Sequence, residues 1–276
     1  MSPVAATAPR RPRRRLSDPG RTYAKRLARY RPGLVEDTLR AMRAMYGRPT
    51  WGRVHDPMSE LVLTILSQNS ADINAERAFD ALARRWPTTT TIEHEGKVNR
   101  PGWGGLGLEP VGTPDWSAVE HAPLDELIDV IRPGGLAPQK APRIQASLRA
   151  VRELRGDHSL EFVGELQATE ALAWLTAIPG VGRKTASVVL LFAFGMALMP
   201  VDRHVERVSK RIGLIQPKAD LAFAHDAFLA LLEPEQVHEA HVNLITHGRQ
   251  TCHALRPACQ RCAIRPRCRY VDPKAP

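Results

Sequence analysis

The chain has 276 residues, which is enough for one large domain or two smaller domains with their own cores. Its net charge of +10 gathers at the two ends: residues 1–30 carry +8, residues 249–276 carry +6 and residues 31–248 carry −4. Basic ends of this kind indicate sequence-independent attraction to phosphate groups. No apolar run reaches 18 residues and no apolar segment follows the N-terminal arginines. We therefore expect neither a transmembrane helix nor a secretory signal, and predict a cytoplasmic protein.

The first half of the chain is predicted to be helical after a basic tail. Residues 1–30 are rich in Arg, Ala and Pro, so we expect them to form a disordered tail. Apolar residues at helical spacing then predict three helices: over 33–46, from Pro57 to about 66, and from a capping Asp72 to Trp86. Residues 87–120 contain a threonine run and several glycines without any period, which predicts a long loop.

The second half of the chain also shows helical spacing throughout. A short helix is predicted over 124–131, and a longer helix buries one face, made of Ile144, Leu148, Val151 and Leu154. Further helices are predicted over 169–177, 184–197, from a capping Asp202 onward, 221–232 and 235–246. No alternating pattern typical of a strand occurs, so the predicted fold class is all-α.

A Gly-x-Gly turn between two apolar helices is the strongest candidate site. Gly180, Val181 and Gly182 let the backbone turn tightly and leave the first amides of the following helix uncovered. Those amides lie at the positive end of the helix dipole, where a phosphate binds well, although a plain helix–turn–helix corner would use the same residues. Lys184 lies in the first helical turn among apolar residues, which lowers its pKa and makes it a candidate amine nucleophile. Asp202 follows 18 residues later.

All four cysteines of the chain lie near its end, at Cys252, Cys259, Cys262 and Cys268. In a cytoplasmic chain, four thiolates around one metal centre are a better interpretation than two disulfides. Either tetrahedral zinc or a [4Fe–4S] cluster has this ligand set. Zinc sites usually pair two short Cys-x2–4-Cys segments, and this spacing contains one, which favours iron–sulfur. Five arginines in or beside this loop are candidate phosphate contacts: Arg256, Arg261, Arg265, Arg267 and Arg269.

Together these motifs resemble the endonuclease III family of helix–hairpin–helix DNA glycosylases. The resemblance rests on Ile178 to Ala186 (IPGVGRKTA), on Val201 to Val205 (VDRHV) and on the cysteine spacing, and it covers roughly residues 30–271. It implies two helical domains with a DNA cleft between them. One is a helical barrel with the hairpin at 50–197, in which 87–120 looks like a loop insertion. The other joins 31–49 to 198–276 and holds a [4Fe–4S] cluster.

The resemblance also implies a function. The expected activity is that of a base excision repair glycosylase with AP lyase activity, which removes oxidised pyrimidines. Its partner is double-stranded DNA with damaged bases or abasic sites, bound by a monomer at the nucleoid of a bacterial cytoplasm. Lys184 would attack C1′ and form a Schiff base, and β-elimination would follow. Asp202 would stabilise charge on the sugar or take a proton from the lysine; helix capping alone is its alternative role.

The same resemblance points to residues that fill the gap left by an extruded nucleotide. Gln68 and Asn69 are candidates to bond the unpaired partner base, and Leu136 is the candidate wedge. Arg203 departs from the family, which often has threonine there. The alternatives are a mismatch glycosylase for adenine, thymine or uracil and a non-catalytic DNA-binding protein. Ile65 stands where the adenine enzymes carry a catalytic glutamate, and the presence of both Lys184 and Asp202 opposes a purely binding role.

Overall fold

The computed structural model describes residues 18–88 and 112–276, and within them the chain is helical throughout. An isolated bridge between Pro87 and Pro114 is the one β-type pairing of these residues. The α-helices are α1 (Asp18–Tyr30), α2 (Leu34–Tyr46), α3 (Pro57–Leu66), α4 (Asp72–Arg85), α5 (Trp116–His121), α6 (Leu124–Val130), α7 (Ala137–Arg155), α8 (Ala168–Thr176), α9 (Arg183–Phe194), α10 (Arg203–Ile212), α11 (Leu221–Leu231) and α12 (Val237–Gln250). The short 3-10 turns are η1 (Arg132–Gly134), η2 (Glu161–Glu165), η3 (Pro234–Gln236), η4 (Cys259–Arg261) and η5 (Arg265–Arg267).

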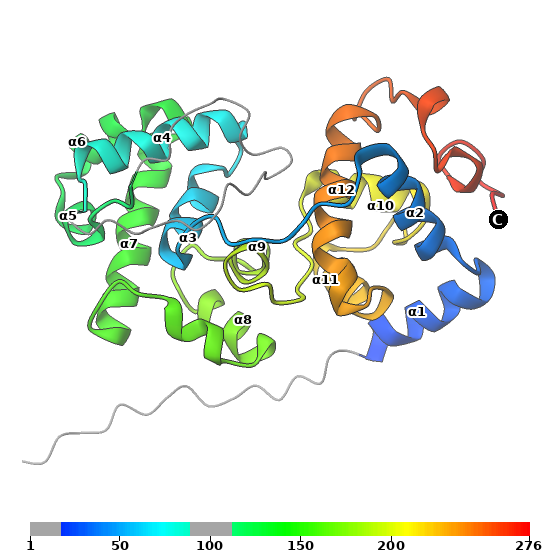
Figure 1. Ribbon diagram of the computed structural model, residues 1–276, viewed down its shortest axis with the longest axis horizontal. Coiled ribbons are helices and arrows are strands. Elements are labelled where there is room, and N and C mark those ends of the chain that lie inside the picture. The colour runs from blue at the N-terminus through cyan, green and yellow to red at the C-terminus, as the bar shows by residue number, and fades with distance from the viewer. Residues whose placement is uncertain (1–17, 89–111) are drawn as a thin grey trace, which may run out of the picture.

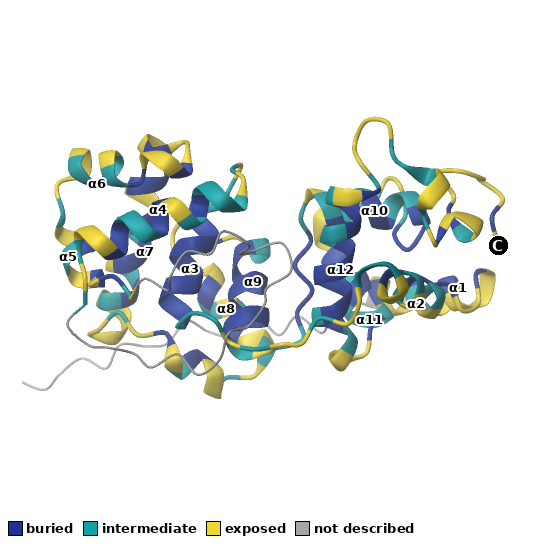
Figure 2. Cartoon of the chain, turned by 45° about the horizontal axis from the view of Figure 1, so that its top comes forward, coloured by how far each residue is buried: buried dark blue, intermediate teal, exposed yellow. Residues whose placement is uncertain are grey.

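The helices gather into two lobes, each with its own hydrophobic core (Figure 1). The first core is built from residues 58–198, and the second joins α1 and α2 to residues 188–268. Helix α9 lies between the lobes and belongs to both: Val189 and Leu190 face the first core, whereas Leu191 and Phe192 face the second. Because it is covered on both sides, α9 is apolar nearly all round, and Figure 2 shows it buried over most of its length. The all-α, two-lobed prediction is confirmed.

The sequence signals that begin and end these helices work as expected. Asp56 caps α3 by accepting hydrogen bonds from the backbone N–H groups of Met58 and Ser59, both at 3.0 Å. Pro57 follows at the first helical position, where its missing N–H costs nothing. The end of α9 differs from the prediction of a helix over 184–197: the helix stops at Phe194, because Gly195 has a φ of 67°, in the left-handed region that favours glycine and ends helices.

Two predictions of irregular structure were wrong. Residues 18–30, assigned to the basic tail, form α1; residues 1–17 lie outside the described part. Helix α1 packs on α11, and the hydroxyl of Tyr23 donates to Leu214 O at 3.0 Å. The helix was missed because Tyr23 and Leu27 are the only large apolar residues that it buries, which is too few to give a clear helical pattern. Within the predicted loop 87–120, residues 116–121 form α5, capped by Asp115, and residues 89–111 lie outside the described part.

Two smaller predictions also need correction. Asp72 is the first residue of α4, and Ala71 holds the capping position without a side-chain bond. Leu154 was assigned to the buried face of α7 but is 61% exposed, because the helix projects past the core in its last turn. The other three residues of that face are fully buried: Ile144, Leu148 and Val151.

The lobes are joined by contacts as well as by α9. The connection between α2 and α3 runs beside α9, where Trp51 Nε1 donates to Leu191 O at 2.8 Å (Figure 1). Arg183 on α9 forms an ion pair with Asp226 on α11 at 2.6 Å. These contacts fix the relative position of the lobes, and so the shape of the space between them. In the described ranges, every helix is too short or too polar to cross a membrane.

Candidate active site and DNA-binding loops

A cleft of about 1200 Å³ lies between the lobes, and it brings together four of the residues that the sequence singled out. Lys184, Asp202, Gln68 and Asn69 all line it. The first lobe supplies the segment from Ser67 to Ile73, and the second lobe supplies residues 201–204 and the end of α12. The residues from the end of α12 are Ile245 and Arg249, and Glu76 and Leu221 complete the lining.

Lys184 lies half-buried at the second position of α9, with its amine in the cleft. Burial lowers the pKa of Lys184 below its usual value, as the sequence predicted. Three carboxylates, on Asp202, Asp72 and Glu60, raise the pKa of Lys184, and the Arg249 guanidinium lowers it. Because burial is the largest of these effects, a larger share of the lysine is the uncharged, nucleophilic amine than in water.

Asp202 caps α10, and this confirms that part of its predicted role. Its Oδ1 accepts hydrogen bonds from the backbone N–H groups of His204 and Val205, both at 2.8 Å. Both capping bonds use the same oxygen. The capping geometry therefore fixes the side chain and leaves Oδ2 uncommitted by the cap, so capping and chemistry in the cleft are compatible.

His241 on α12 is buried, and it interacts electrostatically with Asp202 and Lys184. Its Nδ1 lies 3.1 Å from Pro200 O and donates to it. Burial lowers the pKa of His241 to about 3, although the Asp202 carboxylate opposes the shift. The imidazole is therefore uncharged at neutral pH and adds no positive charge near the lysine.

The hairpin joins α8 to α9 as predicted, but its three residues do different things. Gly180 has a φ of 80°, whereas Gly182 is extended, with a φ of −85° and a ψ of 172°, so positive φ is required at one glycine only. Val181 is buried in the first core and its N–H donates to Ile178 O at 3.1 Å, so neither group faces outward. Gly182 is exposed at the capping position of α9, where no described side chain caps the helix.

The predicted gap-filling residues lie on two neighbouring loops. Asn69 and Leu136 each have a φ of 53°, a left-handed conformation that is strained for residues other than glycine. Asn69 is exposed, and Leu136 is 44% exposed although it is a large apolar side chain. Gln68 is tied down: its Oε1 accepts from Arg143 at 3.2 Å, and its Nε2 donates to Thr185 Oγ1 at 3.4 Å.

Two residues of this region were missed by the sequence analysis. Arg249 on α12 forms an ion pair of 2.7 Å with Asp72 across the cleft. The partners are far apart in sequence, and no motif links them. Lys140 is 1% exposed although it is a lysine. A sequence signal did exist for it, because Lys140 lies one helical turn before Ile144 and therefore on the buried face of α7.

The four cysteines meet around one small apolar cavity of about 20 Å³. Arg211 Nη1 donates to Cys252 Sγ at 3.4 Å, and His247 Nε2 lies 3.5 Å from Cys262 Sγ. In residues 18–88 and 112–276, no three His, Cys, Asp or Glu side chains converge as ligands of a single metal ion. The four thiols nevertheless line one cavity, with a nitrogen atom beside each of two sulfurs, and four cysteine thiolates are the ligand set of an iron–sulfur cluster.

Comparisons with known proteins agree with this geometry. The HhH-GPD family model, described as a superfamily of base excision DNA repair proteins, matches residues 62–227. Endonuclease III of Sulfolobus acidocaldarius is 33% identical over 219 residues, which are 79% of this chain and 84% of that protein. A non-covalent endonuclease III–DNA complex has a TM-score of 0.65 at 27% identity, and covers 86% of this chain and 94% of its own. A trapped endonuclease III–DNA covalent intermediate has a TM-score of 0.66 at 26% identity, and the match covers 86% of this chain and 95% of that chain.

A helical hairpin beside an interlobe cleft, together with the family match, defines a base excision repair protein of the HhH-GPD superfamily. The relatives narrow the assignment. The chain belongs to the endonuclease III family and is a base excision repair DNA glycosylase. AP lyase activity is typical of this family.

Proposed function

We propose that this glycosylase is bifunctional and that Lys184 is its nucleophile. The observation that carries the proposal is that Lys184 and Asp202 line the same cleft, with the pKa of the lysine lowered by burial. The amine of Lys184 attacks C1′ of the extruded nucleotide, the C1′–N bond breaks, and the base leaves with a proton. The C1′–O4′ bond then breaks and O4′ takes the remaining N–H proton, so the sugar ring opens and a C1′=N Schiff base forms. The Schiff base acidifies C2′–H; a base takes this proton, a C2′=C3′ double bond forms, and the C3′–O bond breaks, so the downstream strand leaves with a 5′ phosphate.

Asp202 contributes electrostatically to this reaction. Its carboxylate raises the pKa of Lys184, which means that it attracts positive charge at the amine and at the sugar beside it. Because the cap holds Oδ1, Oδ2 is the oxygen that faces developing charge or accepts a proton from the lysine. A carboxylate that is fixed before the reaction needs no reorganisation during it.

The substrate we propose is double-stranded DNA with an oxidised pyrimidine or an abasic site. The open amides at the start of α9 receive a backbone phosphate near Gly182, and the 67–70 and 134–136 loops enter the gap left by the extruded nucleotide. We choose oxidised pyrimidines as the substrate class because the resemblance to the endonuclease III family implies them. A structural relative that was trapped as an endonuclease III–DNA covalent intermediate supports a covalent route.

We further propose that Cys252, Cys259, Cys262 and Cys268 hold a [4Fe–4S] cluster. When bound, such a group would join the last part of the chain to the second core through four metal–sulfur bonds. Four exposed arginines of this loop would then form a fixed surface for DNA phosphates: Arg256, Arg261, Arg265 and Arg269. Arg267 does not belong to this surface, because it pairs with Asp37 and donates to Pro32 O and Pro276 O. Both lobes of one chain complete the cleft, so we expect a monomer, acting at the nucleoid where its substrate lies.

Borohydride trapping on a duplex that contains thymine glycol tests the lysine assignment. Wild type is compared with Lys184→Ala, and Lys210→Ala is the matched control because Lys210 lies away from the cleft in an ion pair with Glu206. We expect a covalent protein–DNA adduct in wild type and in the control and none in Lys184→Ala. Base release without an adduct would instead indicate a monofunctional mismatch glycosylase. Tight binding without release or adduct would indicate a non-catalytic DNA-binding protein.

A further inference from the structure

Lys140 is a buried amine that the proposed chemistry does not use. It lies in the first turn of α7, and its side chain is almost completely covered by the first lobe. Its Nζ donates to two backbone carbonyls, Leu66 O at 2.6 Å and Gly134 O at 2.8 Å. These two carbonyls belong to separate segments of the chain, so one amino group joins them.

Placing an amine there has an energetic cost. Burial lowers the pKa of Lys140, and lysines are almost never fully buried unless they are paired. The start of α7 is also the positive end of its dipole, which disfavours a cation. An apolar side chain would fill the same space without this cost. What Lys140 adds is therefore its pair of N–H bonds to the two carbonyls.

Both carbonyls immediately precede the loops that face DNA. Leu66 is the last residue of α3, and the loop with Gln68 and Asn69 follows it. Gly134 is the last residue of η1, and Leu136 follows two residues later. The loops are neighbours, because a Cβ built on Gly135 would lie 3.8 Å from Ser70 Oγ.

The left-handed residues lie just beyond these anchor points. Asn69 is three residues after Leu66, and Leu136 is two after Gly134, and each has a φ of 53°. A strained backbone of this kind persists only where its surroundings hold it in place. At the base of each loop, a hydrogen bond from the Lys140 amine supplies such a constraint.

We propose that Lys140 is a positioning residue that fixes the 67–70 loop and the 134–136 loop relative to each other. The two loops then enter the DNA as one rigid unit, with Asn69 and Leu136 at a set spacing. This inference rests on the proposed function, because it concerns the extrusion step that precedes attack by Lys184. Lys140 acts through the loops and touches neither the substrate nor the reacting atoms.

The test compares Lys140→Met with wild type on two substrates. The first is a duplex with thymine glycol opposite adenine, where a base must be extruded and a gap filled. The second is a single strand with a preformed abasic site, where neither is needed. We expect the single-turnover cleavage rate to fall roughly tenfold on the duplex and to change by less than about twofold on the single strand. Gln139→Met, on the same helical turn but exposed, is the matched control.

Equal losses on the two substrates, or no loss on either, would overturn the proposal, because a merely structural lysine does not distinguish them. If Lys140→Met fails to fold, Lys140→Gln is measured by the same criterion, since its amide retains a donor for one carbonyl. A wild-type protein that forms no borohydride adduct would refute the Lys184 chemistry. That result is separate from the ratio of the two rates, which tests Lys140.

Discussion

Arg249 and Asp72 form an ion pair of 2.7 Å that spans the cleft from one lobe to the other. Asp72 begins α4 in the first lobe, and Arg249 lies near the end of α12 in the second. Both side chains also act on Lys184: Asp72 raises its pKa and Arg249 lowers it. The pair therefore joins the two lobes across the cleft and also acts on the charge of Lys184.

Removing either partner of this pair should shift the pH dependence of adduct formation, in opposite directions. Asp72→Asn removes a negative charge, so the pKa of Lys184 falls further and the reaction proceeds at lower pH. Arg249→Gln removes a positive charge, so the pKa rises and the reaction needs higher pH. The measurement is the rate of borohydride trapping against pH under single-turnover conditions. Shifts of the same sign in both variants would contradict the assignment. The other groups that face the lysine stay in place, namely Asp202, Glu60 and His241.

Asparagine at position 202 should separate capping from chemistry. Asn caps helices as well as Asp does, so the free energy of unfolding of Asp202→Asn should lie within a few tenths of a kcal/mol of the wild-type value. Asp202→Ala loses both capping bonds and should cost about 1 kcal/mol. Both variants lack the carboxylate and should lose roughly a hundredfold or more in base-excision rate. Thermal unfolding and single-turnover excision measure the two effects. A fully active Asp202→Asn would show that capping is the only role.

The two hairpin glycines should respond differently to alanine. Gly182 has a φ of −85°, and a Cβ there would meet no protein atom within 4 Å, so Gly182→Ala should fold with nearly unchanged stability. Its methyl group would occupy the space where a phosphate approaches, so DNA affinity should fall. Gly180→Ala must hold a φ of 80° and should lose roughly 1 kcal/mol of stability. Thermal unfolding and DNA binding at two salt concentrations check both. Unchanged affinity in Gly182→Ala would argue against a phosphate contact.

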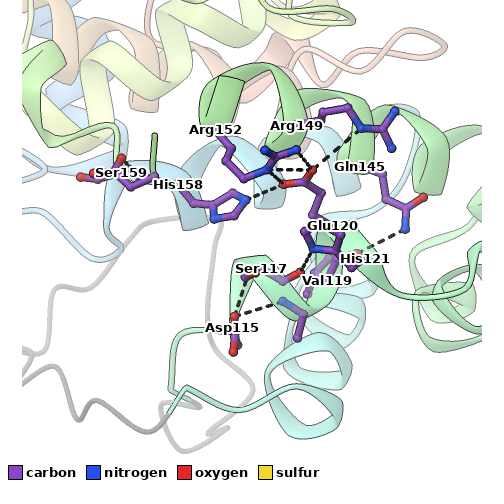
Figure 3. Close-up of polar contacts among 12 residues, drawn as sticks. Asp115, Ser117, Val119, Glu120, His121, Gln145, Arg149, Arg152, His158 and Ser159 are labelled. Atoms are coloured by element: carbon purple, nitrogen blue, oxygen red, sulfur yellow. Dashed lines mark hydrogen bonds and ion pairs between the residues drawn. The ribbon is translucent and has the colours of Figure 1, made fainter. Parts of the chain in front are cut away.

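A buried carboxylate far from the cleft should control acid stability. Glu120 on α5 is 4% exposed, and its carboxylate bonds Arg152 at 2.8 Å and His158 at 2.7 Å (Figure 3). The hydrogen bond from Arg152 is the main reason that the pKa of Glu120 is lowered to about 2. Glu120→Gln should therefore cost roughly 2 kcal/mol at pH 7. Glu126→Gln is the control, since its ion pair with Arg85 is partly open to solvent and its loss should cost less than about 1 kcal/mol.

The acid dependence of that contribution has a defined sign. The folded pKa of Glu120 lies below its ordinary value of 4.5, so the folded protein favours the charged form. The stabilisation is complete above pH 4.5 and is lost as the pH falls towards 2. Chemical denaturation between pH 7 and pH 3 should show the difference between wild type and Glu120→Gln narrowing with acid. A constant difference over this range would contradict the assignment.

Local chemistry accounts for what the sequence predicted well. Asp56 and Asp202 act on the backbone within three residues, so the starts of α3 and α10 could be predicted from the sequence. Lys184 was recognised because its position and its apolar neighbours are sequence features. Helices α1 and α5 were missed because each depends on a distant partner: α1 packs on α11, and Glu120 of α5 bonds Arg152 of α7.

The sequence by itself determined the helical class, the hairpin with its lysine and aspartate, and the set of four cysteines, because periodicity, caps and spacing are local properties. The tertiary structure decided which groups that are distant in sequence come together. Asp72 pairs with Arg249 across the cleft, and within the first lobe Lys140 donates to the carbonyls of Leu66 and Gly134. Only folding brings such charges and carbonyls within bonding distance. Burial then shifts the pKa of Lys184 and Lys140 by removing water from around their amines.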